Sequence, residues 1–364
     1  MIKKCLSFVL SFTVILSGLL AVTACDFTSD GDESGGTVLP DGSEQIPSGG
    51  SEELLQAFTY TQTGESYKIT GIKNKSVTQI VVPDCVTEIE KGAFNGCNAV
   101  ASITLPFTGT SKLTKQGEQI FDENYFAAIF GEYDIKSESN CVPETLKSVT
   151  LTQGITEIRY GAFYRCSGLT KITIPNSVTI IGSYAFNGCS GLTEITIPNG
   201  VTTIGSYAFY RCSGLTEITI PSSVTEIWEG AFYLCSGLTE ITIPSSVTTI
   251  GENVFSGCSG LTNITISNGV TAIGKNEFSG CSGLTEIKIP NSVTTIGEGA
   301  FYGCSGLTKI TIPNSVTTIG EHAFSGCSGL RRVHFIGSPR DWAWIQIEYG
   351  NEELTDATLH FFLY

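Results

Sequence analysis

The sequence predicts a β-rich, right-handed solenoid with short parallel strands, few helices and capped ends. A unit of 23 residues, SGLTxIxIPxSVTxIGxxAFxxC, repeats along the C-terminal half of the chain with almost no change in length. A fixed period of this size is typical of solenoids, in which each coil contacts mainly its two neighbours. Cysteines spaced 23 residues apart mark eight consecutive coils: Cys166, Cys189, Cys212, Cys235, Cys258, Cys281, Cys304 and Cys327.

Each unit is expected to contain two short extended segments. In the first, Leu169, Ile172 and Ile174 point to one side, as in a strand. Pro175 ends this strand because proline lacks the N–H that a ladder requires. A turn follows, and residues 178–182 form the second extended segment. A divergent first unit precedes the marked coils, so the period predicts nine full units.

Stacking places equivalent residues in columns, and three columns are expected to form the core. One unit alone has nothing against which to bury these side chains, so several must stack. We expect the column cysteines to be buried free thiols. Their side chains point the same way in every coil, and this arrangement suits core packing better than disulfide formation. The other two core columns are Leu169, Leu192, Leu215, Leu238, Leu261, Leu284 and Leu307, and Phe163, Phe186, Phe209, Phe232, Phe255, Phe278, Phe301 and Phe324.

Two further cysteines, Cys85 and Cys141, lie outside this column. Cysteine-rich exported chains often carry disulfides. A disulfide between Cys85 and Cys141, which would tie an insertion to the first unit, is therefore kept as a hypothesis.

Residues 1–24 have the features of a secretory signal, with a short basic start and an apolar run. The run ends in Val-Thr-Ala-Cys, which resembles the lipobox of bacterial lipoproteins and implies lipidation of Cys25. An ordinary signal peptide cleaved near Ala24 is the alternative. Residues 25–53 form an acidic, Gly- and Ser-rich tether, because so polar a segment cannot offset the entropy lost on ordering.

The remaining chain is expected to divide into an N-terminal cap with the first repeat (54–106), an insertion (107–143), the solenoid (144–336) and a C-terminal cap (337–364). The insertion is rich in aromatic residues and either packs on the flank, with a short helix near its middle, or acts as the binding device. In the C-terminal cap, Ser338 followed by proline indicates a helix start. Caps protect the open ends of a solenoid.

The repeat core I-P-x-S-V-T-x-I-G-x-x-A-F-x-x-C resembles the BspA-like, or treponemal, leucine-rich repeat family. The segment V-P-x-x-L-K-S-V at 142–149 and the cap residues Trp342 and Trp344 are similar to the same family. The resemblance covers roughly residues 59–364. It implies a leucine-rich repeat fold at the bacterial cell surface, and some family members are adhesins for host matrix or plasma proteins, or for other bacteria.

Charge and composition argue against several other functions. The chain has 35 acidic and 20 basic residues and no basic patch, so nucleic acid is not an expected partner. Membrane contact is expected through the lipid anchor only. The three histidines are scattered and no C-x-x-C occurs, so neither a metal nor a cofactor is expected.

No enzymatic activity is expected either. Glu194, Glu217, Glu240 and Glu286 share one strand column, which places neighbouring carboxylates about 5 Å apart, as in retaining glycosidases. Because these glutamates lie on an open, solvated surface, we expect a solvated charge ladder and not a catalytic pair. Outward-facing threonines form a second column beside it.

Tyrosines at outward positions form the candidate ligand-binding site. Tyrosine is frequent at recognition surfaces because its ring offers contact area and its hydroxyl a hydrogen bond. The expected function is adhesin-like binding of a protein partner. A carbohydrate-binding or envelope-structural module is the alternative, and rings that merely cover the coil edge would have no binding role. The candidate residues are Tyr164, Tyr184, Tyr207, Tyr210, Tyr233 and Tyr302.

Overall fold

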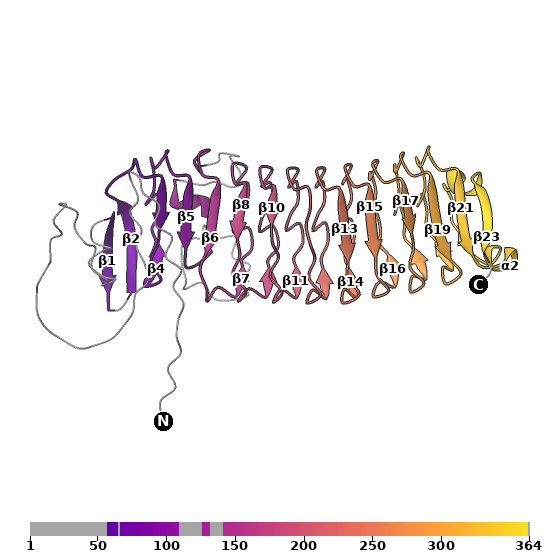
Figure 1. The fold of residues 1–364 in the computed structure, drawn as a ribbon, viewed down its shortest axis with the longest axis horizontal. Helices are drawn as coiled ribbons and strands as arrows, with labels where there is room; N and C mark the ends of the chain where they lie inside the picture. The colour runs from indigo at the N-terminus through magenta and orange to yellow at the C-terminus, as the bar shows by residue number, and fades with distance from the viewer. Residues whose placement is uncertain (1–56, 65, 109–125, 132–140, 363–364) are drawn as a thin grey trace, which may run out of the picture.

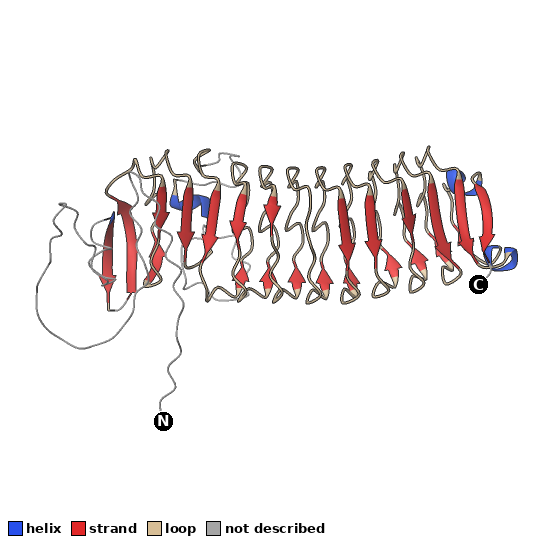
Figure 2. Cartoon of the chain, in the orientation of Figure 1, coloured by secondary structure: helices blue, strands red, loops and turns tan. Residues whose placement is uncertain are grey.

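A computed structural model describes residues 57–64, 66–108, 126–131 and 141–362, which form an elongated rod (Figure 1). The chain winds through about twelve turns with a repeat of about 23 residues, which confirms the predicted β-solenoid. The nine full units lie within this rod, and the interrupted coil and the two ends supply the additional turns. Figure 2 shows strands along the whole rod and helices only in short pieces.

The main strand column follows the L-x-x-I-x-I segment of each coil. Its strands are parallel, with residues one repeat apart opposite each other, as in the pair Ile241 and Ile264. Inward side chains are buried and outward ones, such as Thr242 and Thr265, are exposed. The strands of this column are β3 (Gln79–Val81), β5 (Ser102–Leu105), β6 (Ser148–Leu151), β8 (Lys171–Thr173), β10 (Glu194–Ile195), β13 (Glu240–Ile243), β15 (Asn263–Ile266), β17 (Glu286–Lys288), β19 (Lys309–Pro313), β21 (Arg332–Ile336) and β23 (Thr358–Phe362).

The second strand column is shorter in each coil. It is also parallel, as in the pair Thr203 and Glu226. The described part of this column is interrupted between β4 and β7, where the chain leaves the coil for the insertion. Its strands are β4 (Val86–Ile89), β7 (Glu157–Ile158), β9 (Ile180–Ile181), β11 (Thr203–Ile204), β12 (Glu226–Ile227), β14 (Thr249–Ile250), β16 (Ala272–Ile273), β18 (Thr295–Ile296), β20 (Thr318–Ile319) and β22 (Gln346–Ile347).

The predicted leucine, phenylalanine and cysteine columns form the core. Each of their members named above is at most 1% exposed. The phenylalanine rings from Phe163 to Phe324 stack continuously, with centroids 5.2 to 5.7 Å apart. Full burial of one such side chain stabilises a fold by about 2–3 kcal/mol. Because each ring contacts the rings of the coils before and after it, this stabilisation links neighbouring coils.

From Cys189 to Cys327, the thiol of each column cysteine bridges two coils. The Cys212 thiol donates to the carbonyl of Phe186 at 3.2 Å, and the same carbonyl accepts the Cys189 N–H at 3.0 Å. The thiol therefore uses the second lone pair of a buried carbonyl, and the contact recurs up to Cys327. These cysteines are buried free thiols, as predicted. Burial raises the pKa of the Cys189 and Cys258 thiols to about 12.

Backbone contact between coils fixes the pitch of the rod. A Cβ on Gly237, in the S-G-L turn, would lie 2.3 Å from the carbonyl oxygen of Ser213 in the preceding coil. Threonine hydroxyls also donate to carbonyls one coil back, as Thr239 does to Thr216 at 3.1 Å. The backbone contacts, and not the variable outward residues, therefore set the spacing between coils.

An antiparallel hairpin begins the rod. In this hairpin β1 (Phe58–Thr63) pairs with β2 (Ser66–Ile72), and β2 pairs in parallel with β4. The hairpin gives the first coil a strand neighbour that the repeat itself does not provide.

The described part of the insertion continues the phenylalanine column. The expected short helix is here one 3-10 turn, η1 (Phe126–Ile129). Phe126 contacts Phe163 at 5.3 Å and Phe130 at 5.5 Å, and Phe130 contacts Phe94 at 6.1 Å, all between ring centroids. These contacts support a packing role for this part of the insertion, but in the core column and not on the flank of the solenoid. The other insertion aromatics, Phe121, Tyr125 and Tyr133, lie outside the described residues.

A short helix, α2 (Pro339–Trp342), opens the C-terminal cap at the predicted start. The Ser338 hydroxyl accepts the Asp341 N–H at 3.2 Å, and the Asp341 carboxylate accepts the Ser338 N–H at 2.8 Å. This reciprocal pair is a capping box.

Side chains next to a second helix, α3 (Glu352–Thr355), end the coil-to-coil ladder. The Asn351 side-chain oxygen accepts the Phe324 N–H at 3.0 Å, and the Glu353 carboxylate accepts the Gly326 N–H at 2.8 Å. In earlier coils a backbone carbonyl of the next coil accepts these donors. The side chains thus replace the missing coil.

The expected signal, Cys25 and the tether lie in residues 1–56, outside the described residues. In the ranges that are described, no helix has the length and apolar character needed to cross a membrane.

Candidate functional site

Two positions in each full coil adopt a left-handed backbone conformation. In the coil of Phe301 both are glycine, Gly299 with φ 61° and Gly303 with φ 71°. Glycine suits such positions because it has no Cβ to clash with the following carbonyl. The first left-handed column is Gly161, Tyr184, Tyr207, Gly230, Asn253, Asn276, Gly299 and His322; the second is Arg165, Gly188, Arg211, Leu234, Gly257, Gly280, Gly303 and Gly326.

Large side chains replace glycine in these columns mainly in the coils up to residue 234. A left-handed conformation costs an ordinary residue roughly 1–2 kcal/mol. Strained backbone of this kind concentrates at functional sites, where the side chain is needed at that place. The residues concerned are Arg165 (φ 56°), Tyr184 (φ 59°), Tyr207 (φ 55°), Arg211 (φ 59°) and Leu234 (φ 58°).

The tyrosines of the first column form a stack along the rod. The rings of Tyr184 and Tyr207 have centroids 5.3 Å apart and an interplanar angle of 27°, and Tyr160 contacts Tyr184 at 5.4 Å. The Tyr207 ring covers Gly230, where an added Cβ would meet it. Neighbouring coils therefore cover the ring faces of this stack.

A second tyrosine stack runs beside the first. The rings of Tyr210 and Tyr233 stack at 5.2 Å with an interplanar angle of 14°. Tyr210 also meets Tyr207 edge to face at 5.9 Å, which joins the two stacks. All three rings are half-buried.

Two arginines lie over tyrosines at the repeat position of this second stack, which Tyr164 also occupies. The Arg165 guanidinium is 5.4 Å from the Tyr164 ring centroid, and the Arg211 guanidinium is 5.0 Å from that of Tyr210. The Arg165 stem passes over Gly188, where an added Cβ would be 3.2 Å from its Cγ. We call the whole set the tyrosine–arginine surface; it comprises Tyr160, Tyr164, Arg165, Tyr184, Tyr207, Tyr210, Arg211 and Tyr233.

Acidic and aromatic neighbours border this surface. The Tyr207 hydroxyl donates to Glu229, and this hydrogen bond raises the pKa of Tyr207, while burial raises that of Tyr184. Both hydroxyls therefore keep their protons at neutral pH. The Trp228 side chain is 45% exposed and its indole N–H donates to Glu226 at 3.0 Å.

The structure brings five of the six candidate tyrosines together. Tyr302 lies apart and is 53% exposed, because serines occupy its place in the two adjacent coils, Ser279 and Ser325. Sequence reasoning missed Tyr160, both arginines and Trp228. The signal that it could have used is the loss of the column glycine at Arg165 and Arg211. Ligand binding by these residues stays a prediction.

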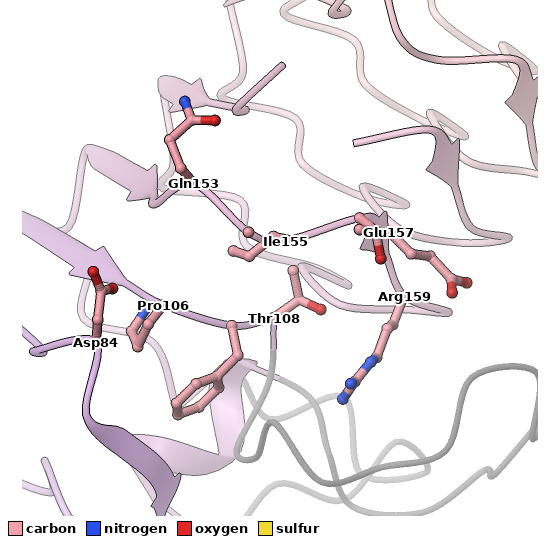
Figure 3. Close-up of a pocket in the computed structure, with 10 residues that line it drawn as sticks. Asp84, Pro106, Thr108, Gln153, Ile155, Glu157 and Arg159 are labelled. Carbon is pink, nitrogen blue, oxygen red and sulfur yellow. The ribbon is translucent and has the colours of Figure 1, made fainter. Parts of the chain in front are cut away.

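A cavity of about 580 Å³ lies beside this surface, near the gap in the second strand column. Figure 3 shows Asp84 and Pro106 on one side of it and Glu157 and Arg159 on the other. Burial raises the pKa of Glu157 and lowers that of Arg159, and each charge partly offsets the effect on the other. The walls also include Phe107, so polar and apolar groups face the same space.

The remaining predicted features fall elsewhere. The glutamate column is exposed, and two of its members form ion pairs, Glu194 with Lys171 at 3.8 Å and Glu286 with Lys309 at 2.6 Å. It is a solvated charge ladder. The described residues hold no group of three or more His, Cys, Asp or Glu side chains that could bind a metal ion.

Cys85 and Cys141 are both half-buried and pack against the core. Nothing in the structure tests the disulfide between them, which stays a prediction.

The coil geometry and buried leucine, phenylalanine and cysteine columns define a leucine-rich repeat solenoid. The model of the BspA type leucine rich repeat region matches residues 70–142, 134–262 and 253–341, with six copies of its unit. The chain therefore belongs to the BspA-type leucine-rich repeat family, which confirms the resemblance drawn from the repeat.

Three solved structures illustrate the similarity. A leucine-rich cell surface protein from Faecalibacterium prausnitzii is 28% identical, with 80% of this chain and 96% of that chain covered and a TM-score of 0.42. A leucine-rich repeat protein from Bacteroides ovatus is 22% identical, with 84% and 98% covered and a TM-score of 0.45. The leucine-rich repeat protein of T. pallidum is 21% identical, with 79% and 91% covered and a TM-score of 0.38. No curated protein matches the chain.

Proposed function

We propose that this chain is a cell-surface binding protein that holds a protein partner on its tyrosine–arginine surface. The observation that carries the proposal is the strained backbone at Arg165, Tyr184, Tyr207 and Arg211, in columns where the rest of the rod has mostly glycine or asparagine. Glycine at these positions would avoid the strain, so the use of large side chains there supports a role in recognition. We propose binding, not catalysis, as the function of the chain.

The covered ring faces favour a protein over a sugar at this surface. Sugars stack on the open face of an aromatic ring, whereas the faces of Tyr184 and Tyr207 are turned toward neighbouring coils. Tyrosine and arginine are also the residues that are enriched at protein interfaces and among their binding hot spots. The partner class that we propose is a host matrix protein or a surface protein of another bacterium.

A double variant, Tyr184→Asn with Tyr207→Asn, tests this proposal. Asparagine occupies the same column at Asn253 and Asn276, so the fold accommodates it. The measurement is biolayer interferometry of the full chain against a panel of matrix and bacterial surface proteins. We expect binding to weaken by about tenfold or more, as for removal of central interface aromatics.

The matched control is Tyr302→Ser, which removes a tyrosine that lies apart and restores the serine of the adjacent coils. It should bind like the wild type. Equal binding by all three proteins would contradict the proposal and move attention to the insertion flank.

Saccharide binding is the second candidate function, and its place is the cavity beside Glu157. Two carboxylates, a guanidinium and a glutamine line this space together with Phe107. This mixture of polar groups with an aromatic ring fits a small polar ligand. On a glycan array, a signal lost in Glu157→Gln but kept in the double tyrosine variant would support this site, and the absence of any signal would dismiss it.

We further propose that the mature chain is attached to the bacterial envelope through lipidated Cys25. The lipobox-like sequence before this residue supports the assignment. Cys25→Ala should move the protein from the membrane fraction to the soluble fraction. Retention of the variant in the membrane fraction would contradict lipid anchoring.

A further inference from the structure

We propose that two copies of this chain associate through the outer face of the main strand column, with their rods antiparallel. In this dimer Glu217 of each copy pairs with Arg332 of the other, and Glu240 pairs with Lys309. The inference goes beyond the proposed function, because the tyrosine–arginine surface follows the second strand of each coil and is not part of this face.

Opposite charges gather at opposite ends of this outer face. One outward position changes from acidic to basic residues along the rod, and its members lie opposite each other where the strands pair. The next outward position is threonine in most coils, but Lys288 and His334 replace it at the basic end. The residues at the first position are Glu194, Glu217, Glu240, Asn263, Glu286, Lys309 and Arg332. A face with this distribution is complementary to itself when it is turned end for end.

Three of these charged side chains lack a partner within the rod. Glu217, Glu240 and Arg332 are exposed, and their side chains form no ion pair or hydrogen bond with any residue that the structure describes. Lys309 is paired with Glu286 at 2.6 Å. Its ammonium group has three donors, so it can add a second carboxylate without losing the first. The three unpaired charges are available to a second copy as they stand.

The acidic end of the face is hollowed where basic side chains would enter. A cavity of about 290 Å³ opens over Glu217 and Glu240. Its lining also includes Thr219, Thr242 and Asn263, whose side-chain oxygens can accept N–H donors. The cavity therefore has both space and acceptors for basic side chains of a second copy.

The basic end presents its charges from a regular sheet. The strands that begin with Lys309 and Arg332 pair over five residues, so these two side chains project from neighbouring strands. Burial lowers the pKa of His334, and the charges of Lys309, His360 and Arg332 lower it further. These effects show that the positive charges of this end lie close together.

A two-fold axis selects the antiparallel arrangement. An axis that runs parallel to the strands, between the coils of Asn263 and Glu286, reverses the rod and keeps each outward position over itself. Asn263 then faces Glu286 of the other copy, and its side-chain amide can donate to that carboxylate. Rods placed in parallel and in register would instead put like charges over each other, which is repulsive. A two-fold contact also makes every pair twice.

The charged pairs match on both sides of this axis. Glu240 and Lys309 are equally far from it, and Glu217 and Arg332 are each one further coil away. Because both copies have the same coil spacing, this match holds whatever the exact pitch of the rod. Two ion pairs of each kind therefore form at once.

The size of the face sets the expected strength of the contact. The coils from Glu217 to Arg332 give a contact roughly 30 Å long at about 5 Å per coil, and about 17 Å wide for a strand of five residues. The two copies together would bury about 1,000 Å², which is at the lower end for a specific complex. The dimer is therefore expected to be reversible and to depend on concentration.

Sedimentation velocity of the full chain over a range of concentrations tests the inference. We expect the wild type to change from monomer to dimer as the concentration rises. Glu217→Lys and Arg332→Glu each replace two ion pairs with two repulsive contacts, and each should weaken dimerisation by at least about tenfold. A wild type that stays monomeric or forms larger species would overturn the inference, as would undiminished dimerisation of either variant.

A mixture of the two variants gives the sharpest test. In a mixed dimer the new lysine of one copy meets the new glutamate of the other, and the unchanged Glu217 meets the unchanged Arg332. Equimolar mixing should therefore restore the dimer that each variant has lost. Failure of the mixture to dimerise would overturn the proposed pairing, and an unrelated basic protein would then be the better occupant of the acidic end.

The matched control is Glu194→Lys, which makes the same change of charge one coil earlier in the same column. In the proposed dimer Glu194 faces Thr358 of the other copy, so its charge is not needed for pairing. We expect this variant to dimerise like the wild type. A loss as large as that in Glu217→Lys would overturn the specific pairing and leave only an effect of net charge. All substituted residues are exposed, so the variants should fold, and thermal unfolding checks this.

Discussion

The coils of residues 157–234 and those of residues 252–327 have the same stacked core but depart from the consensus repeat at different places, the first on the outer surface and the second in the core. In the first set the phenylalanine rings stack at 5.2 to 5.5 Å, and in the second at 5.2 to 5.7 Å. The first set carries large side chains at its outward left-handed positions. The second keeps glycine and asparagine there up to His322, and places an acid, Glu277, in the core.

This difference shows that the core and the outer surface of the rod vary independently. Backbone contacts and buried columns set the coil, so a costly residue on the outside leaves the stacking unchanged. Strain on the outside can serve recognition because a partner can reach it. A buried acid offers no such contact to a partner.

Among the substitutions that test this difference, the largest change in stability is expected at Glu277. It occupies the place of Ala231 and Ala300, is 2% exposed, and neither of its carboxylate oxygens has a hydrogen-bond partner in the described structure. Burial raises its pKa well above 4.5. We expect Glu277→Ala to raise the free energy of unfolding by about 3 kcal/mol at pH 7, because it removes an unpaired buried carboxyl group.

The pH dependence of this effect has a definite sign. The folded protein holds the Glu277 proton more tightly than the unfolded chain, so stability falls as pH rises from about 4.5 toward the folded pKa. Urea denaturation of the wild type and Glu277→Ala should therefore show a larger gap at pH 7 than at pH 4. Ala231→Glu, the matched change in the first set of coils, should create the same dependence. A gap that does not change with pH would contradict this account.

Removal of a column thiol should have a smaller effect that is equal in the two sets. Cys235 donates to Phe209 and Cys304 to Phe278, each at 3.0 Å. Alanine at either position loses this hydrogen bond and leaves a small cavity, which together should lower the free energy of unfolding by about 2 kcal/mol. Chemical denaturation of the two single variants measures the loss. A difference of more than about 1 kcal/mol between them would show that the two cores are not equivalent.

Exchanging residues at the second left-handed column should change stability by about 1 kcal/mol, with opposite signs in the two sets. Leu234→Gly relieves a φ of 58° and should stabilise the protein, whereas Gly280→Leu introduces the same strain and should destabilise it. Each side chain is followed by a glycine in the next coil, Gly257 or Gly303, so local crowding is matched. Thermal unfolding of both variants gives the comparison, and changes of the same sign would refute the role of backbone strain.

The sequence predicts the regular coils of this molecule because the same residues make the same core contacts in each of them. A period of 23 residues with one cysteine per coil is enough to place Phe232 or Cys235 in the core, and the Ser338-Pro339 pair is enough to start a helix. The described part of the insertion was harder to predict, since no period indicates that Phe126 continues the phenylalanine column.

The candidate site is only partly predictable for a related reason. Column membership shows that Tyr302 and Tyr233 point the same way and that serines separate them, but not that the rings of Tyr207 and Tyr210, from two different columns, meet. The strain at Arg211 depends on a backbone angle, which becomes visible only when the position is recognised as a glycine position in other coils. The repeat core has alanine at the position of Glu277, so the period alone does not predict a buried acid there.

The smallest effect concerns the outer face of the main strand column within the first set. Residues 217–220 form no strand there, and one isolated bridge joins Glu217 to Glu240. Glu194, Glu217 and Glu240 are consecutive members of the column, and like charges opposite each other weaken strand pairing. By contrast, Glu286 and Lys309 form an ion pair in a regular ladder.

Glu217→Lys should therefore extend the ladder between β10 and β13, because the lysine would lie between two glutamates. The expected gain is a few tenths of a kcal/mol, as for exposed cross-strand ion pairs. Hydrogen exchange should show slower exchange of the backbone amides at 217–220 in this variant. Glu217→Gln, which removes repulsion without adding attraction, should give an intermediate rate. Identical exchange in the wild type and both variants would mean that charge is not the cause of the break, and that the coil path itself keeps these strands apart.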